Sequence, residues 1–273
     1  MAEPVNISYG KDGVSVYRTD GERLFACEAR MLVDGEAFVP SYTEGDNSMV
    51  VATDSMKNFI HMHALEYEAT GLEDFLVTLG TRFVERYEQV DSVELHAREV
   101  VFETRAGVVF QRLYDDYGWA HVNIYRGREV EGYRFEGDRL ERSGRNGLHL
   151  VKLRGSSFAD FVRDEYTTLP DAHDRPLFVH MDVSWHNANY RRRVDGERLR
   201  EQLLGTFADF KSESIQHLVN EMGSRALAQF PEIDNIAFRA ENRLWDRAQE
   251  LNDVTVYTDA RPPFGVITLS LSR

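Results

Sequence analysis

The sequence has a single cysteine and no long apolar run. Because Cys27 is the only cysteine in 273 residues, the chain can form neither an intrachain disulfide nor a cluster of thiolate metal ligands. Its apolar neighbours in Leu-Phe-Ala-Cys predict a small buried core residue rather than a reactive thiol. No window approaches the roughly 18 apolar residues of a membrane helix, and no basic segment precedes an apolar one at the N-terminus. We therefore expect a cytoplasmic protein without a membrane partner.

The sequence also lacks the motifs that mark common cofactor and metal sites. It has no Gly-x-Gly-x-x-Gly, P-loop, His-Glu-x-x-His, Cys-x-x-Cys or Gly-x-Ser-x-Gly string. A net charge of −14 argues against nucleic-acid binding, which needs a concentrated basic face. One strand-like segment carries alternating polar residues: His180, Asp182, Ser184 and His186. These residues could be metal ligands, or they could form the solvent-exposed face of a half-buried strand, which is the interpretation we favour. We expect no metal, no cofactor and no nucleic-acid partner.

Two helical segments with similar surroundings indicate that the chain consists of two related halves. Apolar residues recur at helical spacing over residues 72–90 and again over 215–230. In both halves strand-like segments precede the helix, and an acidic turn and another strand follow it. The alternative is an unrelated α+β protein whose halves look alike by chance.

The pattern predicts an α+β fold of two β-β-α-α-β-β domains, covering residues 1–137 and 138–273. In the first domain, Asp-Gly pairs at residues 20–21 and 34–35 predict turns that end strands. Helices would lie on one face of each antiparallel sheet, leaving the other face open. Closing the sheets of several copies into a barrel would remove the exposed edges, so we expect an oligomer.

Four separated segments give the chain a specific resemblance to the urate oxidases. They are Tyr9-Gly10-Lys11, the string SYTEGDNSMVVATDSMKN (41–58), the string FVRDEYTTL (161–169) between Phe158 and Arg175, and Ser214-Ile215-Gln216. The resemblance implies tandem tunnelling-fold (T-fold) domains and a homotetramer with sites at subunit interfaces. It also implies cofactor-independent oxidation of urate by dioxygen to 5-hydroxyisourate and hydrogen peroxide, in purine degradation.

In the first half, the resemblance places a proton-handling pair beside the substrate. Residues 53–55 follow an apolar run and precede a helical pattern, so Thr53, Asp54 or Ser55 is also expected to cap a helix. The resemblance makes Thr53 catalytic and lets the backbone of Asp54 contact the purine. Lys11, in a predicted Gly-Lys-Asp-Gly turn, is otherwise an ordinary lysine, and the resemblance makes it a base that acts through Thr53.

In the second half, the resemblance assigns residues that hold a flat polar ring. Phe158, which could equally be a core residue, would stack on the purine. Arg175 has a planar fork that suits an acceptor edge. Gln216 offers both a donor and an acceptor to an amide-like edge, beside the backbone of Ile215.

Near the C-terminus the match to the family breaks at one position. Asn242 matches an asparagine that, together with Thr53, holds dioxygen or water above the ring. The family's Asn-Lys-His string reads Asn242-Arg243-Leu244 here, and Leu244 cannot carry a proton. The alternatives are therefore an enzyme for another purine-like heterocycle, or a purine-binding homologue with impaired catalysis.

Overall fold

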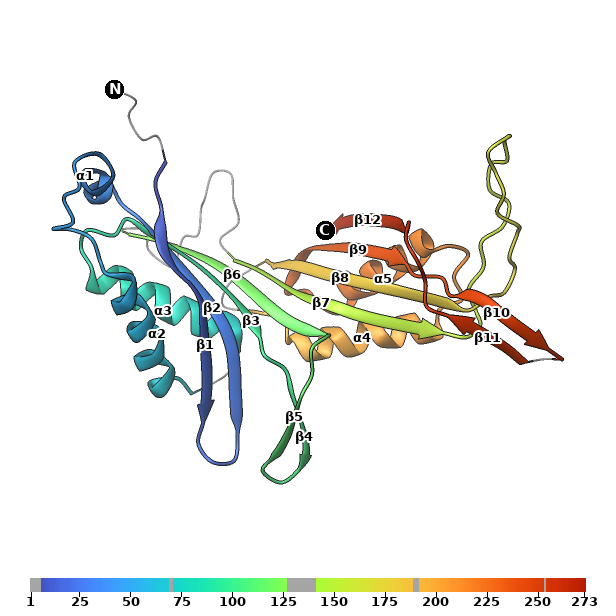
Figure 1. Cartoon of the computed structure of the whole chain (residues 1–273), viewed down its shortest axis with the longest axis horizontal. Coiled ribbons are helices and arrows are strands. Elements are labelled where there is room, and N and C mark those ends of the chain that lie inside the picture. The colour runs from blue at the N-terminus through green and yellow to red at the C-terminus, as the bar shows by residue number, and fades with distance from the viewer. Residues whose placement is uncertain (1–5, 69–70, 127–140, 189–191, 253) are drawn as a thin grey trace. The chain divides into compact units, whose positions relative to one another are not determined.

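The computed structural model divides into two compact units, Met1–Ser143 and Gly144–Arg273 (Figure 1). It describes residues 6–68, 71–126, 141–188, 192–252 and 254–273. The predicted domain boundary, between residues 137 and 138, lies outside the described residues and stays a prediction.

The first unit is an antiparallel sheet with helices on one face (Figure 1). Its strands lie in the order β1-β2-β3-β6. Its elements are β1 (Tyr9–Thr19), β2 (Leu24–Asp34), the 3-10 helix η1 (Glu36–Phe38), α1 (Val39–Thr43), α2 (Thr53–Glu66), α3 (Leu72–Arg86), β3 (Ser92–Glu99), the hairpin β4 (Phe102–Ala106) and β5 (Val109–Arg112), and β6 (Tyr117–Tyr125).

The second unit repeats this plan with strands in the order β7-β8-β9-β12. Its elements are β7 (Glu141–Lys152), β8 (Leu177–Asn187), α4 (Gly196–Asp209), α5 (Ile215–Gln229), β9 (Ile233–Asn242), the hairpin β10 (Asp246–Leu251) and β11 (Val254–Thr258), and β12 (Gly265–Ser272). The predicted α+β fold with two β-β-α-α-β-β units is thereby confirmed. No helix among the described residues is long and apolar enough to cross a membrane.

The two Asp-Gly turns have different roles. The pair at residues 20–21 closes the hairpin between β1 and β2, and Gly21 has a φ of 97°, which favours glycine. The pair at residues 34–35 ends β2 and leads into η1 rather than into another strand.

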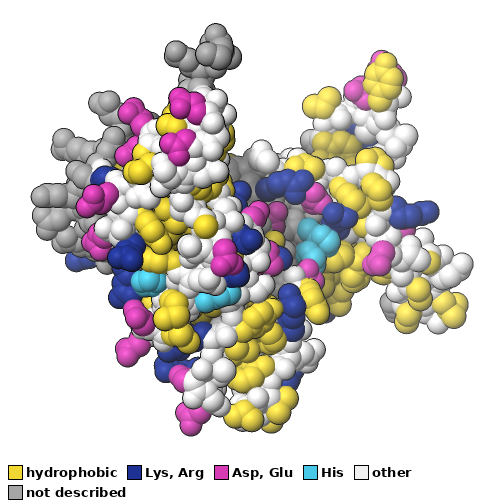
Figure 2. Space-filling model, turned by 60° about the vertical axis from the view of Figure 1, so that its left-hand side comes forward, with side chains coloured by type: hydrophobic (Ala, Val, Ile, Leu, Met, Phe, Trp, Pro, Cys, Tyr) yellow, Lys and Arg dark blue, Asp and Glu magenta, His cyan; other side chains and the backbone are white. Residues whose placement is uncertain are grey.

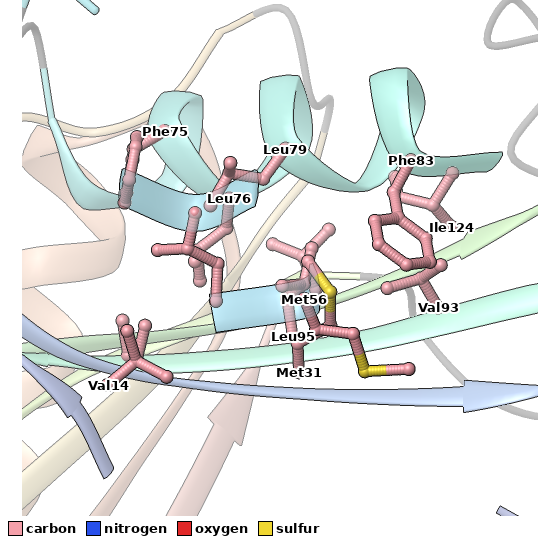
Figure 3. Packing of buried hydrophobic residues seen from close by; sticks show 14 of the residues in the cluster. Val14, Met31, Met56, Phe75, Leu76, Leu79, Phe83, Val93, Leu95 and Ile124 are labelled. Atoms are coloured by element: carbon pink, nitrogen blue, oxygen red, sulfur yellow. The ribbon is translucent and has the colours of Figure 1, made fainter. Parts of the chain in front are cut away.

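Alternation along the strands separates a buried face from a polar one in each unit. The core of the first unit packs α2 and α3 on the sheet, as Figure 3 shows for Met56 and Phe83 against Met31 and Val93. The second unit has its own core under α4 and α5. On the opposite face of β8 lies the predicted polar row of His180, Asp182, Ser184 and His186. Figure 2 shows basic, acidic and histidine side chains interspersed on the visible surface.

A glycine lets the second helix of each unit approach its sheet closely. α3 and α5 are both 15 residues long, and Gly80 and Gly223 are the ninth residue of each. A Cβ on Gly80 would lie 2.6 Å from Cγ1 of Ile124, and one on Gly223 would lie 2.7 Å from Cδ1 of Leu271. The same local solution in both units supports their origin from one repeated plan.

Replacing these glycines therefore has a predictable sign. We expect Gly80→Ala to destabilise the protein by about 1–3 kcal/mol, because overpacking of the core outweighs the helix-propensity gain. Gly205→Ala in α4 is the matched control, since a Cβ there meets no atom within 4 Å. Gly205→Ala should raise the free energy of unfolding by up to about 1 kcal/mol. Denaturant unfolding of both variants measures the difference, and equal effects would contradict this packing.

Cys27 is fully buried in the first core, as predicted for a small core residue. Burial, with the nearby carboxylate of Glu99, raises the pKa of its thiol to about 12. We expect the folded protein to resist a thiol reagent at pH 8, because the reactive thiolate is scarce and inaccessible. Denaturant should expose one thiol per chain. Rapid stoichiometric labelling of the native protein would contradict this placement.

Candidate functional site

The first group of candidate residues lies where β1 runs beside the start of α2. The Tyr9 hydroxyl accepts a hydrogen bond from the Val51 amide, with 2.8 Å between oxygen and nitrogen. Further along, a ring nitrogen of His61 on α2 lies 3.1 Å from the carbonyl oxygen of Ser15 on β1. These bonds hold the Tyr-Gly-Lys segment against residues 51–54. Sequence reasoning overlooked this role of Tyr9, although it begins one of the four motif segments.

Lys11 lies on a bulged strand, so the predicted Gly-Lys-Asp-Gly turn is wrong. Lys11 pairs with Met31 of β2, and the register shifts between Lys11 and Val14. Gly13 there has a φ of 66°, which supplies the left-handed conformation of a bulge. At Gly10 the strands lie so close that a Cβ would come within 1.8 Å of the Met31 carbonyl oxygen. A turn and a bulge share this glycine-rich signature, and pairing with β2 decides between them.

Thr53 is the first residue of α2 and not its cap. Ala52 occupies the N-cap position, and no side chain caps the helix. The carboxylate of Asp54 instead binds Lys57, with 2.6 Å between Oδ1 and Nζ. This bond, followed by the Coulomb attraction of Lys57 and with a smaller contribution from Lys11, lowers the pKa of Asp54. The predicted cap is therefore wrong, and the Thr53 hydroxyl has no hydrogen-bond partner among the described residues.

The backbone at this helix end also presents donors. The first intrahelical bond in α2 runs from the Met56 amide to the Ala52 carbonyl. The amides of Thr53, Asp54 and Ser55 precede it, so they have no partner within the helix. The Thr53 hydroxyl and the backbone amides of residues 53–55 thus lie together at the N-terminus of α2. The positive charge of Lys11 acts on Asp54 in the same place.

The second group gathers around the N-terminus of α5. The Ser214 hydroxyl caps this helix by accepting from the His217 amide at 3.0 Å. The side chain of Ile215 is buried in the core, so of this residue only the backbone is available for contact with a ligand. The side-chain amide of Gln216 is exposed and makes no hydrogen bond to any described residue.

Phe158 and Arg175 lie on neighbouring segments of the same unit. The Phe158 amide donates to the Ala172 carbonyl at 2.7 Å, and the Arg175 amide donates to the Ser156 carbonyl at 2.9 Å. The guanidinium carbon of Arg175 lies 5.8 Å from the centre of the Phe158 ring. The Phe161 ring also stacks on Phe158, with 4.9 Å between centroids. Phe158 and Arg175 are both half-buried, so Phe158 is not simply a core residue.

Two of the candidate residues keep a buried polar atom without a hydrogen-bond partner among the described residues: Arg175 at Nε and Asn242 at Oδ1. Trp185 Nε1, Gln202 Oε1 and Ser212 Oγ of the same unit share this feature. Burial also lowers the pKa of the Arg175 guanidinium. Asn242 is the last residue of β9, where it pairs with Val179 of β8 and Gly265 of β12. A buried unsatisfied polar group costs about 1–3 kcal/mol, so each such atom calls for an explanation.

Leu244 follows β9 as a half-buried apolar residue. Its neighbours are fixed, since the Arg243 amide donates to the Phe178 carbonyl at 2.8 Å and the Trp245 ring packs 5.5 Å from that of Phe178. The two histidines that precede Leu244 most closely in sequence are His217 and His186. His217 lies in the first turn of α5, where its ring packs against Phe210, and His186 lies on the polar face of β8.

The candidate residues thus form two groups, one in each unit. The first unit holds Lys11, Thr53 and Asp54, and the second holds Phe158, Arg175, Ile215, Gln216 and Asn242. Within the described residues, no group of three or more histidine, cysteine, aspartate or glutamate side chains is placed to hold a metal ion. The two groups supply complementary chemistry: a cation, a hydroxyl and free amides in one, and a ring face with polar edges in the other.

Comparison with known proteins gives a consistent result over the whole chain. A family model described as uricase matches residues 7–111 and 141–268. The uricase of Halalkalicoccus jeotgali is 36% identical over 98% of both chains. The uric acid degradation bifunctional protein of Bacillus sp. TB-90 is 35% identical over 94% of this chain, which spans 58% of that longer protein. A crystal structure of urate oxidase from Bacillus sp. TB-90 superposes with a TM-score of 0.87 at 34% identity, covering 98% of this chain and 100% of the other.

Proposed function

The chain belongs to the uricase family, and we propose from this premise that it is an oxidoreductase that oxidises urate with dioxygen. The products would be 5-hydroxyisourate and hydrogen peroxide, formed without a cofactor. The observation that carries the proposal is that Arg175 and Asn242, both candidate site residues, each keep a buried polar atom without a partner among the described residues. A ligand that bonds to them would remove the free-energy cost of leaving them unsatisfied.

The second unit would bind and orient the substrate. The Phe158 ring offers a flat apolar face, and Arg175 offers a planar fork to an acceptor edge. Gln216 and the backbone of Ile215 would read the edge of urate that carries alternating N–H and C=O groups. Such a clamp holds the ring in one orientation, which is how a site without a cofactor lowers a barrier.

The first unit would handle protons. Urate must lose a proton to become an electron-rich anion that gives an electron to dioxygen. Thr53 would accept and return protons, with Lys11 acting as the base through the Thr53 hydroxyl. The Asp54 backbone would hold the edge of the urate ring. Asn242 would hold dioxygen and then water. Recombination of the oxygen and urate species would form a hydroperoxide at the ring carbon. The C–O bond to the peroxide would then break, hydrogen peroxide would leave, and water would add to the same carbon to give the hydroxylated product.

The division of the candidate residues between two units of the chain bears on assembly. We propose a homotetramer in which the first-unit group of one copy meets the second-unit group of another, so that sites lie at subunit interfaces. The one-sided covering of each sheet supports association, because strand edges and polar faces gain partners when sheets close into a barrel. The compartment we propose is the cytoplasm.

Leu244 is the specific observation that favours a second candidate. A leucine cannot pass a proton, so the relay that reaches Thr53 would end short. A binding homologue with impaired catalysis, or an enzyme for another purine-like heterocycle, would keep the same clamp. Arg175 and Gln216 therefore do not discriminate between these candidates, whereas turnover does.

A turnover assay tests the proposed function. We expect purified protein to consume urate and dioxygen and to release peroxide in equal amounts, with the same rate in the presence of a metal chelator. Urate absorbance and an oxygen electrode follow the reaction. Tight urate binding without consumption would sink the enzymatic reading in favour of the binding homologue. If urate neither binds nor reacts, a screen of related purines addresses the other candidate.

The role of Thr53 has its own test. We expect Thr53→Ala to lower kcat by roughly 10²–10⁴-fold, as loss of a proton-transfer group does, while the anaerobic Kd for urate changes only severalfold. Ser55→Ala is the matched control, because it removes an exposed hydroxyl from the same helix turn. A Thr53 variant that binds poorly but turns over normally is the contrary outcome.

A further inference from the structure

Two chain segments that lead to candidate site residues meet at a small group of buried serines: Ser156, Ser157 and Ser212, each 3% exposed or less. The Ser157 amide donates to the Ser212 carbonyl at 2.8 Å, and the Ser212 amide donates to the Gly155 carbonyl at 3.1 Å. Residues 155–158, which end at the Phe158 ring, therefore run alongside the segment that leads into α5.

One hydrogen bond between side chains joins these two segments. The Ser157 hydroxyl donates to the carboxylate of Glu213, and it lies 3.3 Å from the Ser212 carbonyl oxygen. A hydrogen bond to a carboxylate is stronger than one between neutral groups, and here its donor, Ser157, is buried. The motifs in the sequence include neither Ser157 nor Glu213.

The two partners adjoin the residues that would hold the substrate. Ser157 directly precedes Phe158, and Glu213 directly precedes Ser214, the cap of α5. Gln216 follows two residues later, in the first turn of that helix. The side-chain bond between residues 157 and 213, together with the backbone bonds at Ser212, therefore joins the segment that carries Phe158 to the segment that leads to Gln216.

We infer that the Ser157–Glu213 bond is a positioning element for the urate site, which rests on the function proposed above. It keeps the Phe158 ring and the side-chain amide of Gln216 in the one arrangement that suits a flat bicyclic substrate. Ser157 and Glu213 would not themselves contact the urate ring. A displacement of about 1 Å in such a site lowers turnover by roughly 10²-fold, so loss of this bond acts at a distance.

Ser212 supplies a matched control within the same serine group. Its hydroxyl is fully buried, one residue from Glu213, yet it has no hydrogen-bond partner among the described residues. Ser212→Ala deletes the same atom type as Ser157→Ala and keeps the backbone bonds. Any difference between the two variants therefore reports the bonds that the Ser157 hydroxyl makes, to Glu213 and to the Ser212 carbonyl, rather than the loss of a buried hydroxyl. The Glu213 variants isolate the first of these bonds.

The experiment compares wild type with Ser157→Ala, Glu213→Ala, the double variant and Ser212→Ala in steady-state urate oxidation and in thermal unfolding. We expect each of the first two to lower kcat/KM by roughly 10–100-fold with a raised KM. The double variant should be no worse than the more affected single one, since both remove one interaction. Ser212→Ala should stay within about twofold of wild type, and Glu213→Gln, which keeps an acceptor, should recover part of the loss.

Several outcomes would overturn the inference. If Ser157→Ala behaves like Ser212→Ala, or if the two single effects multiply in the double variant, the bond has no positioning role. A lower kcat with unchanged KM and a lowered Tm would indicate a smaller folded fraction instead. Glu213 is exposed, so its variants keep the test valid if Ser157→Ala folds poorly. Wild-type protein that is inert toward urate would refute the proposed function itself, a result distinct from failure of the variants alone.

Discussion

Each unit of this chain covers its antiparallel sheet with helices on one face only, and the rest of the structure depends on this constraint. The helices must lie close to the sheet to bury their apolar stripe, and Gly80 and Gly223 permit that approach at equivalent positions. The opposite face is consequently polar, with ion pairs such as Arg30–Glu94 at 2.5 Å and the stacked rings of His149 and His180. A surface of this kind is suited to association rather than to a second apolar core.

The same arrangement places chemistry at helix N-termini. α2 begins at Thr53 without a side-chain cap, and this leaves a hydroxyl and backbone amides for a ligand. α5 does have a cap, Ser214, and in the proposed site the residues around that cap would position the stacking ring and the polar edge. In the second unit, Arg175 and Asn242 each have a buried atom without a partner among the described residues, which lowers stability locally. Under the proposed function, substrate binding would reverse this loss.

The sequence predicted the helices and the order of the elements, because long stretches of apolar residues at helical spacing report burial directly. It failed where one local signature fits two structures. The Gly-Lys-Asp-Gly segment reads as a turn, but pairing with β2 makes it a bulge. Thr53 reads as a cap, but Ala52 holds that position. The Tyr9–Val51 and Ser157–Glu213 bonds join residues far apart in sequence, so no local pattern reveals them. The assigned roles of the site residues stay predictions.

The central claim is that two groups of residues, one from each unit and from different copies of the chain, form one urate site. Co-expression of a Thr53→Ala chain with an Arg175→Ala chain tests it directly, since each variant alone lacks one group. Random isologous pairing would leave about a quarter of the sites with both groups intact, so the mixed oligomer should recover about that share of wild-type turnover. Mixed oligomers that stay as inactive as either parent would contradict a site shared between subunits.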